Sequence, residues 1–247
     1  MSSFLQVENI SKSYGDKVLF QNISFNINEG DKIALIAPNG TGKSSLLKIL
    51  AGLDSSDRGG EIKFMKDIKV AFLDQNCDFN PTNTLFDEVY SRMGDTYEVV
   101  MRYEQAIASG DERRIEQAIA AMDAADGWSA EQRVKQVHSS MKLTRLDQPM
   151  GELSGGEAKR AAIALMLLQD ADFLIMDEPT NHLDLESITA VNNGLAAFKG
   201  NVIFASHDHE FMNTIANRII RINSDGTITD RMCTYDEYLE KLKNNEV

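Results

Sequence analysis

The chain has few cysteines and no long apolar run, and both shortages narrow its class. Among 247 residues only Cys77 and Cys233 are cysteines; they lie far apart and form no CxxC pair, so neither a disulfide framework nor a zinc site is predicted. No apolar segment approaches the ~20 residues that cross a bilayer. Residues 1–15 lack a basic segment followed by an apolar one, so no secretory signal is expected. We expect no direct membrane insertion and a cytoplasmic location.

Positive charge is also scarce. The sequence has 25 Lys and Arg against 38 Asp and Glu, a net charge of −13. Proteins that bind nucleic acid over a broad surface are usually basic, because Lys and Arg displace the counterions of the phosphates. Most of this surface is therefore expected to repel RNA. Residues 91–145 are nearly neutral, with 8 Lys or Arg against 9 Asp or Glu. A solvated, mixed-charge helical face explains this segment, and a local contact surface is the alternative.

A phosphate-binding loop is predicted near the N-terminus. The sequence APNGTGKSS follows the apolar run 32–37 and opens a predicted helix at 43–50, which is the strand–loop–helix setting that such a loop requires. The usual pattern starts with glycine, where this chain has Ala37. A methyl group is harmless there if φ is negative and crowded if φ is positive. The predicted loop comprises Ala37, Pro38, Asn39, Gly40, Thr41, Gly42, Lys43, Ser44 and Ser45.

Two further motifs point to a phosphate. The sequence LSGGE, Leu153–Glu157, places two glycines behind a serine at the head of a predicted helix, so it can offer backbone N–H groups and a positive helix end to an anion. Twenty positions after Glu157, a buried strand ends in DEPTNHLD. Its Asp177 and Glu178 are two adjacent carboxylates at a strand end, where magnesium and an attacking water sit beside a nucleotide.

These three motifs, in this order, resemble the ATP-binding cassette (ABC) family. The resemblance implies an α/β fold with a P-loop parallel-sheet core, an antiparallel β subdomain and an inserted helical subdomain. It implies one cassette over residues 1–247, with a nucleotide-binding core at 1–80 and 155–247 and a helical subdomain at 81–154. The cofactors that it implies are ATP and Mg²⁺.

Three isolated residues fall where the family has functional ones. Tyr14 resembles the aromatic that stacks on adenine, Gln75 the Q-loop glutamine and His207 the switch histidine. Alone, each is more often structural, but their register with the three motifs favours function.

The resemblance also assigns roles in catalysis. Backbone amides of residues 39–43 wrap the β-phosphate, and Lys43 bridges the β and γ oxygens. The expected metal residues are Ser44, Gln75 and Asp177, the last acting through water. Glu178 polarises the attacking water, Gln75 joins water and metal, and His207 contacts the γ-phosphate.

The signature LSGGE serves a second cassette in the family. Two cassettes pack head to tail, so Ser154 and the Gly156 amide cap the partner's γ-phosphate, with Asp184 coupling the two sites. The expected partner is a second copy in an ATP-dependent homodimer, or another cassette if the chain is a fragment. The nucleotide-contacting residues expected on this side are Ser154, Gly155, Gly156, Glu157 and Asp184.

The branch of the family is indicated by finer features. NHLD after the Walker B glutamate and proline, SHD at His207 and the closing TYDEYLEK resemble the ABC-F branch, whose members act on ribosomes, and most of all the first cassette of a Uup-type protein. The 77 residues between Gln75 and Leu153 exceed the number in a typical transporter cassette.

Two features depart from the ABC-F pattern or bear on the extent of the chain. His209 replaces the arginine that often follows SHD in this branch, and Val247 falls about where the ABC-F linker is expected to begin. The ATPase subunit of a membrane transporter is the alternative. An SMC-like or UvrA-like ATPase is disfavoured, since no coiled coil or zinc-binding cysteines interrupt the cassette.

Secondary structure follows from the apolar periodicity. Strands are predicted in the first 75 residues as an antiparallel sheet, and alternating strands and helices after residue 157 as a parallel one. Between residues 85 and 146 the period is helical, with two antiparallel helices whose apolar stripes face each other. Trp128 is expected in the core, and Ser129 with Gln132 in a capping box. The two stripes are Val100, Tyr103 and Ile107, then Ile115, Ile119 and Met122.

Overall fold

The chain forms two compact units in a computed structural model. The first comprises residues 1–76, 170–183 and 195–247, and the second comprises 77–169 and 184–194. The structure describes residues 3–57, 59–75, 79–91, 95–140, 145, 147–169 and 171–244. Cys77 lies outside these residues, so its predicted lack of a disulfide stays a prediction. Cys233 is buried and free.

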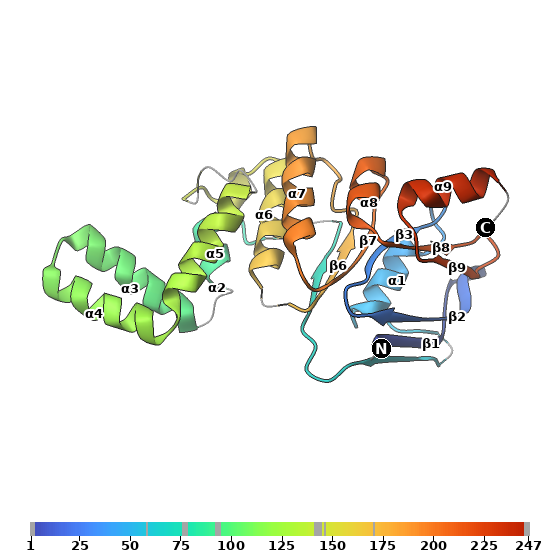
Figure 1. Cartoon of the computed structure of the whole chain (residues 1–247), viewed down its shortest axis with the longest axis horizontal. Helices are drawn as coiled ribbons and strands as arrows, with labels where there is room; N and C mark the ends of the chain where they lie inside the picture. The colour runs from blue at the N-terminus through green and yellow to red at the C-terminus, as the bar shows by residue number, and fades with distance from the viewer. Residues whose placement is uncertain are drawn as a thin grey trace. The chain divides into compact units, whose positions relative to one another are not determined.

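The described residues of the first unit form two sheets (Figure 1). The larger has six strands in the order β5-β6-β7-β3-β8-β9, all parallel except β9, which pairs antiparallel with β8. The smaller is antiparallel, in the order β2-β1-β4. The strands are β1 (Ser3–Tyr14), β2 (Lys17–Asn28), β3 (Lys32–Ile36), β4 (Glu61–Phe64), β5 (Val70–Leu73), β6 (Phe173–Asp177), β7 (Asn201–Ala205), β8 (Arg218–Ile222) and β9 (Ile228–Arg231).

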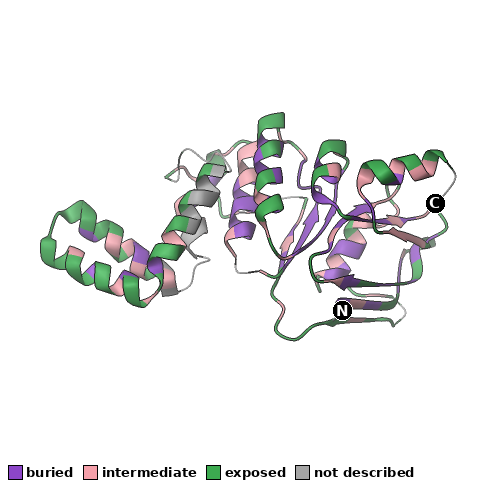
Figure 2. Ribbon diagram, viewed as in Figure 1, coloured by how far each residue is buried: buried purple, intermediate pink, exposed green. Residues whose placement is uncertain are grey.

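The central strands are apolar because both of their faces are covered. Every residue of β6 and β7 is buried, as Figure 2 shows, which is typical of a parallel sheet with layers on both sides. The helices of this unit are α1 (Lys43–Leu50), α8 (His209–Ile215) and α9 (Tyr235–Lys243). Helix α1 lies between the two sheets, and α8 and α9 lie on the other side of the larger sheet (Figure 1). The main core is therefore the layer around α1.

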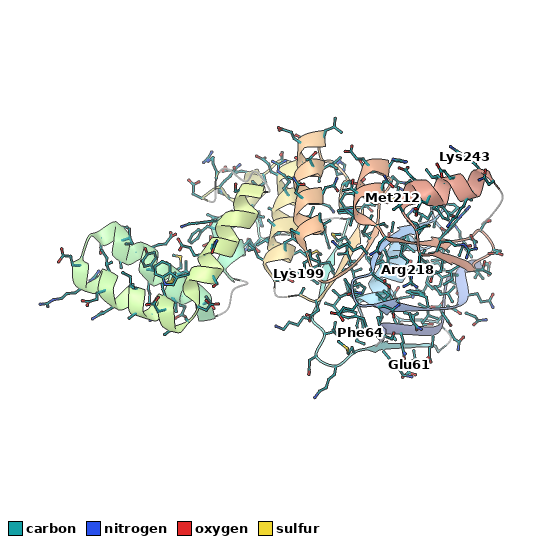
Figure 3. The ribbon with its side chains drawn as sticks, viewed as in Figure 1. Glu61, Phe64, Lys199, Met212, Arg218 and Lys243 are labelled. Carbon is teal, nitrogen blue, oxygen red and sulfur yellow. The ribbon has the colours of Figure 1, made fainter. Side chains whose placement is uncertain are left out.

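A largely buried cluster of charged residues links the strands β3, β8 and β9 at one edge of the larger sheet. Arg218, labelled in Figure 3, opens β8 and donates to Asp31, before β3, and to Asp230 on β9. The side chains of Arg218 and Asp31 are nearly inaccessible to solvent. The pKa of Arg218 is raised because it donates to these carboxylates, chiefly that of Asp230, against the opposing effect of burial. Since buried charges require partners, all three residues act as one unit.

The second unit is helical. Helices α3 and α4 form an antiparallel pair joined at Gly110, as predicted, and α5 packs against both. The facing stripes are only partly as expected: Val100 and Met122 are buried, whereas Ile107 and Ile119 are exposed. The helical elements are α2 (Leu85–Ser91), α3 (Asp95–Ser109), α4 (Glu112–Ala124), α5 (Gly127–Ser140), the 3-10 turn η1 (Met150–Glu152), α6 (Gly155–Leu168) and α7 (Leu185–Ala197), the last of which runs from this unit into the first.

Two expectations for this unit were wrong. Helix α5 begins at Gly127, so Ser129 lies inside the helix and donates to Asp126 instead of capping with Gln132. Trp128 is 36% exposed rather than in the core. Its ring packs edge-on against Tyr103 while its indole N–H donates to Asp123, 2.7 Å away. An indole with a polar partner at the surface satisfies its donor without burial.

The strand predictions for the first unit divide one strand into two and miss two others. The sequence predicts separate strands at 17–20 (KVLF) and 23–28 (ISFNIN), but these residues form the single strand β2. Strands β4 and β9 were not predicted, and both lie at sheet edges. No helix among the described residues is both long and apolar enough to cross a bilayer.

Candidate functional site

A cleft of about 500 Å³ opens in the first unit, and its walls include the segments that follow β3, β6 and β7. These parallel strands end at the same edge of the sheet, where open α/β folds hold their ligands. The segments after β3 and β6 carry the loop and the carboxylates, and the one after β7 carries His207. The lining residues are Tyr14, Leu19, Asn39, Gly40, Gly42, Lys43, Ser44, Ser45, Gln75, Asp177, Glu178, Asn181 and His207.

The loop between β3 and α1 has a backbone that only glycine adopts readily at two positions. Gly40 and Gly42 have φ of 75° and 102°, and a Cβ on Gly42 would lie 2.9 Å from the Cβ of Leu19. Ala37 is not in the left-handed region, so its methyl group is accommodated. The Lys43 Nζ donates to the Ala37 carbonyl at 3.2 Å. Gly42 precedes α1, so the loop delivers its N–H groups at a helix N-terminus.

Asp177 and Glu178 are buried at the end of β6, with exposures of 2% and 7%. Glu178 has a φ of 48°, and its N–H donates to the Ala205 carbonyl at the end of β7. A side chain in this conformation is strained, and such strain concentrates at functional sites. Among the described residues, Glu178 Oε2 is buried without a hydrogen-bond partner. The second oxygen of the carboxylate is therefore available to a group in the cleft.

His207 contacts Glu178 directly. The distance from its Nε2 to Glu178 Oε1 is 3.3 Å, and the imidazole remains largely exposed. The loop before His207 is held by Ser206, whose hydroxyl lies 2.9 Å from that of Thr180 and accepts from the Asp208 N–H. These contacts join the segments that follow β6 and β7, so the carboxylate and the imidazole are positioned together.

Tyr14 and Gln75 complete the cleft from two other elements. Tyr14 ends β1 and is 59% exposed. Gln75 follows β5, and its neighbour Asp74 forms an ion pair with Lys48 of α1 at 3.0 Å. The pKa of Lys48 is raised by this hydrogen bond. The residue before Gln75 is thus tied to the helix that begins at the phosphate loop.

The donor set fits a magnesium ion that is shared with a substrate. No group of three His, Cys, Asp or Glu residues in the described ranges could hold a metal. Mg²⁺ usually takes one or two carboxylates and fills its remaining positions with water and substrate phosphates. Ser44 and Asp177 line the cleft and offer oxygen atoms to such an ion. Glu178, whose Oε2 has no hydrogen-bond partner among the described residues, lines the same cleft.

The predicted signature belongs to the second unit and is built as a helix cap. Ser154 precedes α6, and its hydroxyl accepts from the Glu157 N–H while the Glu157 carboxylate accepts from the N–H and hydroxyl of Ser154. The pKa of Glu157 is lowered by these bonds, that from the Ser154 hydroxyl being the largest cause. Gly155 and Gly156 open α6. Asp184 directly precedes α7, and its carboxylate accepts a hydrogen bond from the N–H of Ser187 in the first turn of that helix.

Other cleft residues escaped the sequence reading. Leu19 and Asn181 line it, and only Asn181 had a signal, since it lies three residues after Glu178. Of the predicted loop, Ala37 and Pro38 instead line a neighbouring cavity of about 270 Å³ with Lys43 and His207. Thr41 donates from its hydroxyl to the Pro38 carbonyl and lines neither cavity.

A family model described as "ABC transporter" matches residues 20–181. The Bacillus subtilis (strain 168) ABC transporter ATP-binding protein YfmR is 40% identical over 99% of this chain and 40% of its own length. The ATP-binding protein Uup of Haemophilus influenzae is 34% identical over 94% of the chain and 37% of its own. The Mycobacterium tuberculosis energy-dependent translational throttle protein EttA is 32% identical over 98% of this chain and 44% of its own length. The chain thus spans about two fifths of the length of these relatives.

Uup and EttA are ABC-F ATP-binding proteins, so the predicted resemblance to that branch is confirmed. A solved structure titled as the ATP-binding subunit of an ABC transporter covers 98% of the chain with a TM-score of 0.73 at 19% identity. That likeness concerns the fold, and it confirms the predicted α/β class with a parallel core and an antiparallel sheet.

Proposed function

Because this chain belongs to the ABC transporter family of ATP-binding cassettes, we propose that it binds Mg-ATP in the cleft of the first unit and hydrolyses it to ADP and phosphate. The observation that carries the proposal is the convergence of Lys43, Glu178 and His207 on one cleft that starts at a glycine-bent phosphate loop. Phosphoryl transfer needs fixed donors and an oriented water more than covalent chemistry, and these groups supply both.

The loop residues bind the substrate's phosphates. Backbone N–H groups of residues 39–43 lie at or just before the N-terminus of α1, which favours an anion, and the Thr41 N–H, bonded to the Pro38 carbonyl at 3.3 Å, would exchange that partner for phosphate. The Lys43 ammonium exchanges the Ala37 carbonyl for phosphate oxygens. Ser44, Asp177 and Gln75 would hold Mg²⁺, which when bound neutralises charge on the phosphates. Tyr14, at the rim of the cleft, offers its ring to the purine base.

Glu178 orients and polarises the attacking water. Its buried oxygen without a protein partner accepts a hydrogen bond from that water, while its other oxygen is held beside His207. The backbone bond to Ala205 fixes the carboxylate against the sheet. His207, which faces Glu178 at 3.3 Å, is positioned to donate to the γ-phosphate as negative charge moves onto the leaving group.

We further propose that the signature acts on the nucleotide of a second cassette. Ser154 and the N–H groups that open α6 would form an anion site at a capped helix end, yet all the described residues that line the ATP cleft belong to the first unit. A head-to-tail pair, with two copies of this chain or this chain and another cassette, uses both surfaces. In this assignment the first unit binds nucleotide, and the second presents the signature and Asp184.

Calorimetry of two variants tests this division. Lys43→Ala removes the full positive charge next to the phosphates, so ATP binding should weaken by ~10-fold or more. Ser154→Arg obstructs only the signature, so ATP affinity for the single chain should stay within twofold of wild type. Lys199→Met, an exposed lysine outside the cleft, is the control. Equal loss of ATP affinity in the Lys43 and Ser154 variants would contradict a signature that acts in trans.

We propose that the ATP cycle serves translation. The relative EttA is named an energy-dependent translational throttle protein. The near-neutral segment 91–145 of a chain with charge −13 provides the surface least repelled by RNA. The alternative, an ATPase subunit of a membrane transporter, is supported by the description of the family, and the solved ATP-binding subunit of an ABC transporter shares the fold at 19% identity.

Co-sedimentation separates the two functions. The Glu178→Gln variant, loaded with ATP and magnesium, should pellet with purified ribosomes, and more of it than with ADP. Removing the charges of Arg113 and Arg114 on the exposed side of α4 should reduce that fraction if the helical unit makes the contact. Binding only to detergent-solubilised membrane protein, with none to ribosomes, would favour the transporter reading.

A further inference from the structure

A buried lysine lies against the ring of Tyr14. Lys12 and Tyr14 are two positions apart near the end of β1, where the register against β2 shifts between Lys12 and Ser13. The Nζ of Lys12 lies 5.6 Å from the centroid of the Tyr14 ring. A cation within ~6 Å of a ring centroid is attracted by the ring's quadrupole. Lys12 is 8% exposed, whereas Tyr14 remains open to the cleft.

The Lys12 ammonium is held by the loop that follows α1. It donates to Asp54 Oδ1 at 2.8 Å and to the Ser55 carbonyl at 2.9 Å, and Asp57 lies 3.5 Å away. Asp57 in turn accepts from the N–H and hydroxyl of Ser13, between Lys12 and Tyr14. One charge therefore joins the end of the phosphate-loop helix to the strand end that carries Tyr14.

The charge state of this cluster supports a fixed geometry. The hydrogen bond to Asp54 raises the pKa of Lys12 against the opposing effect of desolvation, and the same bond lowers the pKa of Asp54. Lysine and carboxylate are thus both ionised at neutral pH. A charge-assisted pair in a sheltered place is more directional than a solvated one.

We propose that Lys12 is a positioning residue that fixes the Tyr14 ring as the platform for the purine base and couples that platform to the phosphate-loop helix. The proposal rests on the assignment of Tyr14 to the base in the proposed function. A ring held by an ammonium ion loses less freedom when a base stacks on it than a freely rotating ring does. Lys12 should therefore contribute to recognition of the base and not of the phosphates.

The test compares two ligands that differ in the base. Binding of Mg-ATP and of inorganic tripolyphosphate with magnesium is measured by calorimetry on the full chain and on Lys12→Met. We expect ATP affinity to fall about fivefold while tripolyphosphate affinity stays within twofold, from the size of cation–π and stacking effects. Lys12→Arg keeps a cation that stacks on rings and should restore most of the loss. Lys63→Met, which removes an exposed lysine paired with Glu61 on β4, is the matched control.

Two further variants keep the outcome decisive. Lys12→Met leaves Asp54 without its cation, so the double variant Lys12→Met with Asp54→Asn removes that unpaired charge and should show the same selective loss. Equal weakening for both ligands, or none for ATP, would overturn the positioning role. Tyr14→Ala checks the premise separately. If Tyr14→Ala leaves the preference for ATP over tripolyphosphate unchanged, the base assignment itself fails. If it abolishes that preference while Lys12→Met and the double variant keep it, only the role of Lys12 fails.

Discussion

At the scale of single residues, Glu178 combines two unfavourable features that the proposed catalysis would use. Its φ of 48° is costly for a residue with a Cβ, and one of its carboxylate oxygens is buried without a hydrogen-bond partner among the described residues. A buried, unsatisfied acceptor costs stability, whereas a water or phosphate in the cleft would satisfy it. The strained conformation persists because the Glu178 N–H is bonded to Ala205. Stability is thus lower at the position where the proposed chemistry needs an aimed carboxylate.

The stabilities of glycine and alanine variants at position 178 should reflect the positive φ of this residue. In denaturant unfolding we expect Glu178→Gly to be more stable than Glu178→Ala by about 1 kcal/mol, because glycine adopts positive φ without strain. The pair Glu210→Gly and Glu210→Ala, in the first turn of α8, is the control and should rank in the opposite order. An alanine variant at 178 as stable as the glycine variant would show that the left-handed backbone is not retained in solution.

At the scale of elements, the cap of α6 should depend on pH. The carboxylate of Glu157 accepts two bonds from Ser154, which lower its pKa below the ordinary value of 4.5. Because the pKa of Glu157 is lower in the folded state than in the unfolded state, its ionised carboxylate stabilises the fold. This stabilisation is fully present above pH 4.5 and is lost as the pH falls through the pKa of the folded state. The stability difference between wild type and Glu157→Gln, measured by urea unfolding, should therefore shrink between pH 6 and pH 3.5. A difference that is constant over this range would contradict the cap.

The ion cluster of β8 is the second element-scale test. Replacing Arg218 by Met leaves Asp31 and Asp230 without their partner, and breaking a buried pair on one side costs about 3–5 kcal/mol. Urea unfolding should show this loss, while Lys199→Met, on an exposed side chain, should change stability by no more than about 0.5 kcal/mol. A loss below 1 kcal/mol for Arg218→Met would mean that the sheet edge does not depend on the cluster.

Local chemistry decided which elements could be predicted. The sequence predicts helices at 43–50 and 235–243, and the bounds of α1 and α9 match them because a glycine-rich loop precedes one and a Thr234 cap precedes the other. The predicted start of helix α5 is three residues late, since Ser129 and Gln132 have the spacing of a capping box that the chain does not use. The edge strands β4 and β9 are four residues long and only partly buried, so they lack the alternating apolar pattern by which strands are recognised.

The site was predictable to the extent that its residues fall in motifs. Lys43, Asp177 and Glu178 stand in contiguous patterns and line one cleft. Lys12 carried no such signal, because its partners Asp54 and Asp57 are more than 40 positions away and only the fold brings them to β1. Contacts of this range depend on tertiary packing and cannot be derived from local spacing.

At the scale of the whole molecule, assembly should depend on nucleotide. Without ATP, two surfaces from a chain of charge −13 repel each other. In the proposed head-to-tail pair and the Glu178→Gln background, ATP would add hydrogen bonds from the partner's Ser154 and Gly156 at each site, worth about 1.5–3 kcal/mol each. Light scattering at tens of micromolar protein should show a monomer without nucleotide and a dimer with saturating Mg-ATP. A monomer in both conditions would mean that this chain pairs with a different cassette.

The central claim is that this cleft hydrolyses ATP through Glu178. Steady-state phosphate release from the wild-type chain and from Glu178→Gln tests it most directly, with Glu210→Gln as the control for loss of a carboxylate elsewhere. Wild type and Glu210→Gln should release phosphate at similar rates. Glu178→Gln should be slower by ~10²-fold or more, as expected for loss of a general base, while it still binds ATP. A Glu178→Gln variant that turns over at a near-normal rate would contradict the account.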